Sequence, residues 1–249
     1  MADRETRRLS FGSVAEDYDR YRPAPPPQAL DWVIPAGAQA ILDLAAGTGL
    51  VTRELAGRAP RIYAVEPDDR MRAVLAARCP EAEVLAGRGE DIPLPPASVD
   101  AVTISAAWHW LDPERAVPEI TRVLRPGGRL GVLWVSRDER VPWVAEFHAF
   151  AREAREADRP PGQRPRRRRV EFPPGTPLSA VEERSFEYAV PMTKDELAGL
   201  LGTYSGIITM EASQREAFTR RVQGFLDRQP WDQADLPLIC RCLRSTRTA

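Results

Sequence analysis

The sequence predicts an α/β fold: a doubly wound, Rossmann-like domain built on an open and mostly parallel sheet. Two observations predict it. Short apolar runs alternate with helical stretches in the first half of the chain, as in successive right-handed β–α–β units. These runs are rich in β-branched residues and almost continuously apolar, which is typical of strands that are buried on both faces of a parallel sheet.

Five strands are expected in the first half of the chain, with amphipathic helices between them. The strand candidates are Ala40–Ala46, Arg61–Glu66, Ala82–Ala86, Val99–Ala106 and Arg129–Val135. The helix candidates are Leu50–Gly57, Asp68–Arg78 and Pro113–Leu124.

The second half predicts a more helical structure. Helices are expected over Pro142–Ala157, Lys194–Tyr204 and Met210–Arg228, a strand over Val181–Val190 and a last edge strand over Leu236–Arg244. The segment Arg159–Pro177 is too rich in proline for a regular helix. No shift of composition marks a second domain. We therefore expect one domain over residues 1–249, with a cap segment at 1–35, a core at 36–136, helical insertions with one strand at 137–235 and the last strand at 236–249.

The composition fits a soluble globular protein. Of the 249 residues, 43% are hydrophobic and 29% are charged, so a large core can form. The net charge of −1 disfavours a nucleic-acid binder that relies on a globally basic surface. No apolar run approaches the roughly 20 residues of a membrane span, and the charged N-terminus is unlike a secretory signal. We expect a cytoplasmic protein that binds neither nucleic acid nor membranes.

A glycine-containing turn after the first strand gives the strongest functional signal. Gly47 and Gly49 let a ligand approach the backbone closely, and the following helix offers free N–H donors. Glu66 ends the second strand, where a carboxylate can accept hydrogen bonds from both hydroxyls of a ribose. This combination predicts an adenosine-type ligand, with an ordinary strand–helix turn as the alternative.

The acid inside the first strand indicates which adenosine compound the turn binds. Thr52 occupies the position of the third glycine in a dinucleotide fingerprint, which argues against NAD. Asp43 lies upstream of the glycines, where it would repel a pyrophosphate and attract a cation. S-adenosylmethionine carries an ammonium and a sulfonium, so it fits this turn better.

Five segments, in order, resemble the class I S-adenosylmethionine-dependent methyltransferases of the small-molecule group called type 11. They are FGSVAEDYDRYRP (Phe11–Pro23), ILDLAAGTG (Ile41–Gly49), VEPDDRM (Val65–Met71), GRGEDIPLPPASVDAVTISAAWHW (Gly87–Trp110) and RVLRPGGRL (Arg122–Leu130). The resemblance is weak after about residue 135. It implies a seven-stranded, mostly parallel sheet with an antiparallel last strand, and helical cap and lid insertions that cover the acceptor.

The resemblance also implies which residues hold the methionine part of the cofactor. The backbone of Ala45, Gly47 and Gly49 would line it, and Asp43 would help to hold its ammonium. Ser105, at the end of the fourth strand, would lie beside the sulfonium.

The nucleoside part and the cap follow from the same resemblance. Glu66 would bind the ribose, and the adenine would be contacted by Pro67, Met71, Gly89 and Glu90. Tyr18 and Arg22 would close the cap, with Arg22 on the cofactor carboxylate and a solvated salt bridge as its alternative. Many relatives have aspartate where this chain has Arg88, so the backbone of Gly89 is expected to contact the adenine amino group instead.

His109 is the candidate base, because it follows the fourth strand at the edge where ligands bind. A structural histidine between Trp108 and Trp110 is the alternative. These two tryptophans either contact the substrate or belong to the core. His148 is expected to be a packed or surface residue.

No metal site is expected. The three cysteines suit neither a disulfide framework nor a zinc site, and Cys240 and Cys242 are expected to be small core residues. The basic residues Arg164 and Arg166–Arg169 predict a solvated loop or, as the alternative, recognition of an anionic substrate.

The sequence therefore predicts methyl transfer from S-adenosylmethionine to a small molecule by in-line displacement, leaving S-adenosylhomocysteine. Oxygen is the first choice of accepting atom, with nitrogen and carbon open. Three alternatives remain: an enzyme of the same fold that uses the cofactor without net methyl transfer, a non-catalytic nucleoside-binding protein, and a nicotinamide dehydrogenase. The sequence indicates neither the acceptor nor an oligomeric state.

Overall fold

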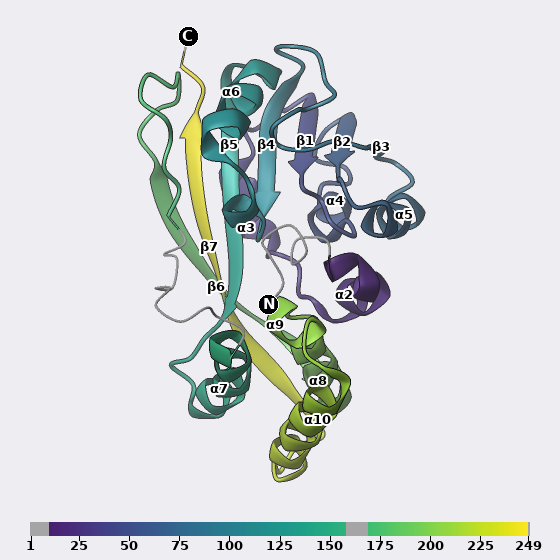
Figure 1. The fold of residues 1–249 in the computed structure, drawn as a ribbon. Coiled ribbons are helices and arrows are strands. Elements are labelled where there is room, and N and C mark those ends of the chain that lie inside the picture. Colours follow the sequence, from purple (N-terminus) through teal and green to yellow (C-terminus); the bar gives the residue numbers. More distant parts are fainter. Residues whose placement is uncertain (1–9, 158–168, 249) are drawn as a thin grey trace. The chain divides into compact units, whose positions relative to one another are not determined.

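The structure is a computed structural model that describes residues 10–157 and 169–248 (Figure 1). The strands are β1 (Ala40–Leu44), β2 (Arg61–Val65), β3 (Glu83–Leu85), β4 (Val99–Ser105), β5 (Leu124–Arg137), β6 (Glu182–Thr193) and β7 (Gln233–Thr246). The helices are η1 (Phe11–Val14), α2 (Ala15–Tyr21), α3 (Pro27–Val33), α4 (Leu50–Glu54), α5 (Asp69–Arg78), η2 (Trp108–Trp110), α6 (Pro113–Val123), α7 (Pro142–Ala157), α8 (Lys194–Gly202), α9 (Ser205–Ile208) and α10 (Ala212–Asp227).

The strands that the structure describes form one seven-stranded sheet in the order β3-β2-β1-β4-β5-β7-β6. The four neighbouring pairs from β3 to β5 are parallel. β7 runs antiparallel to β5, because Gly127 pairs with Arg247 near one end of β5 and Asp138 pairs with Pro237 just beyond the other end. The predicted α/β fold, with a mostly parallel sheet and an antiparallel last strand, is confirmed.

The prediction of an edge position for the last strand is wrong. β7 lies between β5 and β6, and β6 is the edge strand. The alternation of apolar and polar residues that predicts this strand reflects that one of its faces is covered and the other is not, as the alternating burial along β7 shows. It carries no information on the strands beside it, so it cannot distinguish an edge strand from an interior one.

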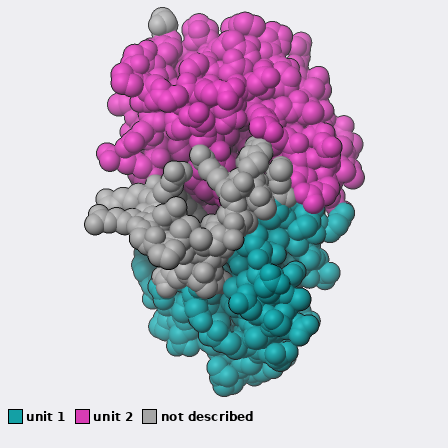
Figure 2. Space-filling view, viewed as in Figure 1, with its two compact units in different colours: residues 1–23, 136–166, 187–239 teal, residues 24–135, 167–186, 240–249 magenta. Residues whose placement is uncertain are grey.

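The chain divides into two compact units, coloured separately in Figure 2. Unit 1 comprises Met1–Pro23, Ser136–Arg166 and Glu187–Ile239, and unit 2 comprises Ala24–Val135, Arg167–Phe186 and Cys240–Ala249. Unit 1 thus gathers most of the segments that the sequence analysis expects as cap and insertions. The single domain over residues 1–249, with its four subdivisions, stays a prediction.

Unit 2 is built on the first five strands, and its core follows from their apolar sequences. β1 is buried along its whole length, including Leu42 and Leu44. α6 is capped by Asp112, whose side chain accepts a hydrogen bond from the Glu114 amide, and the buried face of the helix includes Ile120. The apolar stripe of this helix packs against the buried residues of β1, β4 and β5, whose continuous hydrophobicity predicts them as strands.

Unit 1 has an aromatic core. Phe147 of α7 stacks on Phe225 of α10 with ring centres 6.4 Å apart, and Phe150 lies edge-on to Phe218 at 6.4 Å. Trp143 adds a further ring 6.5 Å from Phe147. Aromatic rings contribute large apolar areas, so few helical turns suffice to hold these helices together.

Candidate functional site

Four parallel strands bring the candidate residues of unit 2 to one edge of the sheet. β1 pairs with β2 on one side and with β4 on the other, and β3 follows β2. The carboxyl ends of parallel strands lie at the same edge, and the chain reverses its direction of progress across the sheet between β1 and β4. Ligands of open α/β sheets bind outside such a switch point.

The turn between β1 and α4 has an unusual backbone. Ala45, Gly47 and Gly49 all have positive φ, at 56°, 61° and 90°. The Ala46 amide donates to the carbonyl of Val65 at the end of β2, over 3.1 Å. This bond fixes the turn against the second strand, while Gly47 faces open space, since a Cβ placed there meets no atom within 4 Å.

Gly49 is required for packing as well as for its backbone angle. A Cβ at Gly49 would lie 2.6 Å from Cδ1 of Leu75 and 2.7 Å from Sγ of Cys79, and both of these side chains are buried. Only a residue without a side chain therefore lets α5 approach the turn this closely.

We expect Gly49→Ala to destabilise unit 2 about 2 kcal/mol more than Gly57→Ala, because overpacking adds about 1–3 kcal/mol to the backbone cost. Gly57 is the matched control: its φ is 75°, but a Cβ there meets nothing within 4 Å. The backbone cost of about 1–2 kcal/mol is common to both variants. Urea denaturation of the two variants measures the difference, and equal losses would show that α5 yields to the added methyl group.

Glu66 joins the two turns that follow β1 and β2. Its Oε2 accepts a hydrogen bond from the Gly47 amide and its Oε1 accepts one from the Asp68 amide, both over 2.9 Å. The residue is only 7% exposed. A carboxylate offers about four acceptor positions, and a hydroxyl group of a ligand can donate to an oxygen that already accepts one amide bond.

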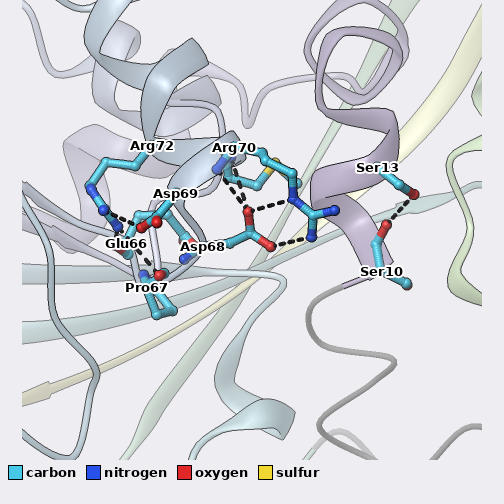
Figure 3. Close-up of polar contacts among 9 residues, drawn as sticks. Ser10, Ser13, Glu66, Pro67, Asp68, Asp69, Arg70 and Arg72 are labelled. Carbon is cyan, nitrogen blue, oxygen red and sulfur yellow. Dashed lines mark hydrogen bonds and ion pairs between the residues drawn. The ribbon is translucent and has the colours of Figure 1, made fainter.

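The start of α5 is fixed by a residue that the sequence analysis did not single out. The carboxylate of Asp68 accepts hydrogen bonds from the amides of Arg70 and Met71 and pairs with the Arg70 guanidinium at 2.8 Å (Figure 3). An aspartate directly before an expected helix is the N-cap signal that could have revealed it. Met71 is buried and Pro67 is half-buried.

Asp43 is a buried acid held by two hydroxyl groups. It is 1% exposed; its Oδ2 accepts a bond from the Thr52 hydroxyl (2.7 Å) and its Oδ1 accepts one from Thr103 (3.3 Å). Burial raises the pKa of Asp43 to about 7; the two hydroxyl bonds oppose this shift, and the nearby charge of Glu66 adds to it. A neighbouring cation would favour the ionised form of such a group.

The loops after β3 and β4 are held together near the candidate base. The Oε1 of Glu90 accepts a bond from the Asp112 amide over 2.8 Å, at the end of the η2 loop. A Cβ at Gly89 would lie 2.8 Å from Cδ2 of Leu111, so this glycine permits close contact of the two loops. Arg88 pairs its backbone with Asp91 in an isolated bridge, which fixes the turn between them.

η2 presents its three aromatic residues differently. Trp108 is 4% exposed and lies in the core, with its ring centre 6.1 Å from that of Phe172. His109 and Trp110 are half-buried, and their ring centres are 4.6 Å apart. The half-buried Ser105 ends β4, three residues before this helix.

Tyr18 and Arg22 lie in unit 1. The Arg22 guanidinium donates to the hydroxyl of Thr203 (2.8 Å) and to its carbonyl (3.0 Å), and it lies over the rings of Tyr18 and Tyr204. His148 also belongs to unit 1, where its Nδ1 lies 2.6 Å from the carboxylate of Glu139.

The remaining candidates divide as follows. Cys240 and Cys242 are buried, with their sulfur atoms 3.5 Å apart. Arg169 pairs with Glu171, whereas Arg164 and Arg166–Arg168 lie outside the described residues. Within residues 10–157 and 169–248, no three His, Cys, Asp or Glu side chains gather as metal ligands would. In the same ranges, no helix is long and apolar enough to cross a membrane.

Comparison with known proteins identifies the family of this chain. A family model for a methyltransferase domain, of type 11, matches residues 42–132. The chain is 42% identical over 242 residues to an uncharacterized methyltransferase of Mycobacterium tuberculosis, covering 96% of each. It is 32% identical over 212 residues to an uncharacterized methyltransferase-like protein of Schizosaccharomyces pombe, covering 83% of this chain and 82% of the relative.

A solved structure shares the fold. That of an Anaeromyxobacter dehalogenans protein, provisionally named a type II methyltransferase, has a TM-score of 0.67 and 25% identity, and the match covers 91% of this chain and 98% of the other. The family-model match, the relatives and this fold show that the chain belongs to the class I S-adenosylmethionine-dependent methyltransferases of the type 11 family.

Proposed function

We propose that the carboxyl edge of β1, β2 and β4 binds S-adenosylmethionine, and that the chain transfers its methyl group to a small molecule. The observation that carries this proposal is the place of Glu66, whose carboxylate accepts hydrogen bonds from the Gly47 and Asp68 amides at the carboxyl ends of β1 and β2. The carboxylate accepts hydrogen bonds from the ribose hydroxyls, and the open space at Gly47 admits the methionine part.

Each of the other candidate residues has a part in this proposal. Asp43 favours the cofactor's ammonium through its charge, and Ser105 lies beside the sulfonium. The backbone of Ala45 and Gly49 lines the methionine part, and Tyr18 and Arg22 close the cap. The adenine is contacted by Pro67, Met71, Gly89 and Glu90.

Bound S-adenosylmethionine supplies a methyl group on a positively charged sulfur, a good leaving group. Transfer to the accepting atom would break the carbon–sulfur bond, and the electron pair of that bond would stay on sulfur as S-adenosylhomocysteine. The protein's contribution is to orient the acceptor in line and to exclude water. His109 takes the proton of a hydroxyl acceptor, which makes oxygen the first choice of atom; nitrogen and carbon acceptors need the same positioning.

Calorimetry with S-adenosylhomocysteine and with NAD tests the cofactor assignment. We expect binding of S-adenosylhomocysteine only. Absence of binding would contradict the proposal, and binding of NAD alone would favour a dehydrogenase. Mass analysis of the products during turnover of an acceptor then tests methyl transfer, because an enzyme that merely uses the bound sulfonium would form no S-adenosylhomocysteine.

We expect His109→Ala to slow turnover of a hydroxyl acceptor by about 10²–10⁴-fold, the usual contribution of a general base, while the affinity for S-adenosylhomocysteine stays nearly unchanged. His148→Ala is the matched control, since His148 lies on α7 beside the carboxylate of Glu139 and is not among the candidate site residues. Steady-state rates and calorimetry on both variants measure the two effects. Near-normal turnover of the His109 variant would show that His109 has only a structural role beside Trp110 and is not the base.

The proposal extends to the surroundings of the reaction. Trp110, half-buried against His109, is offered as an acceptor contact, and Trp108 as the packed residue behind it. We propose that the enzyme acts in the cytoplasm, without nucleic-acid or membrane partners, which the balance of acidic and basic residues supports.

A further inference from the structure

The loop after β3 is fastened to α6 by an ion pair within unit 2. Glu119 and Arg122 lie three residues apart on α6, a spacing that brings their side chains together on one face of the helix. The Nε of Arg122 donates to Oε1 of Glu119 and its Nη2 donates to Oε2, each over 2.7 Å. The side chains of Glu119 and Arg122 are 22% and 32% exposed, so this forked pair is partly shielded from water.

Both members of the pair also bind the backbone of the loop. The Ile92 amide donates to Oε2 of Glu119 over 2.9 Å. The guanidinium of Arg122 donates to the carbonyl of Ile92 (2.8 Å) and to that of Leu94 (2.7 Å). Four of the five N–H donors of Arg122 are thus in use, two on Glu119 and two on the loop.

The sequence of the loop explains why it needs partners from α6. Prolines follow both Ile92 and Leu94, and a proline has no N–H to donate to another strand or turn. The side chains of Ile92 and Leu94 are buried in the core of unit 2, so the carbonyls at these positions have limited access to water and need donors from the protein. Arg122 supplies both of them.

The same loop carries the expected adenine contacts. Gly89 and Glu90 come two and three residues before Ile92, and Glu90 is held separately by the amide of Asp112, the N-cap of α6. A residue of extended chain spans at most about 3.6 Å. While Ile92 is attached to α6, the backbone of Gly89 can therefore shift only slightly.

We propose that Glu119 and Arg122 are positioning residues for adenine recognition: by fixing Ile92 and Leu94, they hold Gly89 where its backbone distinguishes the amino group of the base. This inference rests on the proposed function, because the loop meets an adenine only if the cofactor binds there. Neither residue is placed in contact with the cofactor, so both act through the loop. Their effect is therefore expected on the choice of base.

Calorimetry of the full-length protein with S-adenosylhomocysteine and with S-inosylhomocysteine tests the proposal, since an oxo group replaces the amino group in the second compound. We expect the wild type to bind S-adenosylhomocysteine at least about tenfold more tightly, because one hydrogen-bond partner is lost in the inosine compound. Arg122→Gln should reduce this preference at least about threefold, since the loosened loop no longer holds its donor and acceptor groups in place. Glu119→Gln should have a smaller effect, because the amide oxygen can still accept the Ile92 bond.

Arg125→Gln is the matched control. Arg125 pairs with Asp100 over 2.7 Å, and the same aspartate accepts bonds from the amides of Gln39 and Ala40 at the amino ends of β1 and β4. This variant loses a comparable ion pair at the opposite edge of the sheet, so its preference between the two compounds should equal that of the wild type. If Arg122→Gln weakened both compounds by the same factor, Arg122 would be structural only and the inference would be wrong.

Hydrogen exchange in the cofactor-free protein follows the loop itself. We expect the Ile92 amide to exchange at least about tenfold faster in Arg122→Gln and at the wild-type rate in Arg125→Gln. Unchanged exchange in Arg122→Gln would show that the pair does not hold the loop. Should Arg122→Gln fail to fold, Arg122→Lys replaces it, because lysine keeps the charge but loses the fork, and a weaker preference for adenine is still expected.

The behaviour of the wild type separates the two proposals. If it binds neither compound, the proposed function fails and the adenine role fails with it, whereas the exchange rates still report whether the pair holds the loop. If it binds both compounds equally well, the cofactor site stands but the backbone of Gly89 does not distinguish the base, and the inference alone is overturned.

Discussion

Replacing Glu66 by alanine is expected to lower the affinity for S-adenosylhomocysteine by at least about a hundredfold. Hydrogen bonds to charged groups contribute about 1.5–3 kcal/mol each, and two bonds to the ribose are lost. Each 1.4 kcal/mol corresponds to a factor of ten in affinity. The Gly47 and Asp68 amides also lose their shared acceptor, so the turn that admits the methionine part is released at the same time.

Isothermal titration calorimetry measures this effect, with Glu83→Ala as the control because Glu83 is an exposed acid on β3. Circular dichroism establishes that both variants are folded. Glu66→Gln should fall between the wild type and the alanine variant, since an amide has one acceptor oxygen for two backbone N–H groups. An unchanged affinity in the alanine variant would show that Glu66 does not bind the ribose. The proposed cofactor site would then lose its main support.

Most of the fold of unit 2 follows from local sequence patterns. The strands β1, β2 and β4 have continuous apolar sequences because both of their faces are covered, so hydrophobicity alone places them within a residue or two. α5 is equally well marked, with Asp68 at its start. β5 is longer than expected, since it begins at Leu124 and includes the adjacent pair Gly127 and Gly128, which normally indicates a turn.

Contacts between distant parts of the chain account for what the sequence did not indicate. Arg22 and Thr203 are 181 residues apart, and no periodicity or motif links them. The sequence predicts Asp43 as an acid that attracts a cation, but its hydroxyl partner Thr103 comes from β4, sixty residues later. Local patterns predict an element and its buried face, whereas such partners depend on which strand becomes the neighbour.

The buried carboxyl of Asp43 should make the stability of the protein depend on pH in an uncommon direction. Its pKa is about 7 in the folded protein and 3.8 by reference, so the folded state holds the proton more tightly. The stabilisation is complete below pH ~4 and is lost as the pH rises through 7. A shift of three units corresponds to a ceiling on the order of 4 kcal/mol.

Denaturant unfolding of the wild type and of Asp43→Asn, from pH 4 to pH 8, isolates this contribution, because the other acids are common to both proteins. We expect the free energy of unfolding of the wild type to fall relative to that of Asp43→Asn as the pH rises. Asp100→Asn is the control: the pKa of Asp100 is lowered, so its contribution to stability changes only below about pH 4, and its difference from the wild type should stay flat from pH 4 to pH 8. Burial alone would raise the pKa of Asp100, but Arg125 and the amides of Gln39 and Ala40 hold this pKa below its usual value. A pH-independent difference for Asp43→Asn would contradict the raised pKa.

The same titration links Asp43 to the cofactor. Only the ionised carboxylate attracts an ammonium group, so binding of S-adenosylhomocysteine must draw the proton from Asp43. The affinity of the wild type should therefore rise between about pH 5 and pH 8, and binding near pH 6 should release a proton, which calorimetry in buffers of different ionisation enthalpy detects. Asp43→Asn should abolish both effects. If the wild type bound with no proton release and no pH dependence, Asp43 would be a structural acid held by Thr52 and Thr103 alone, and the ammonium would be held by other groups.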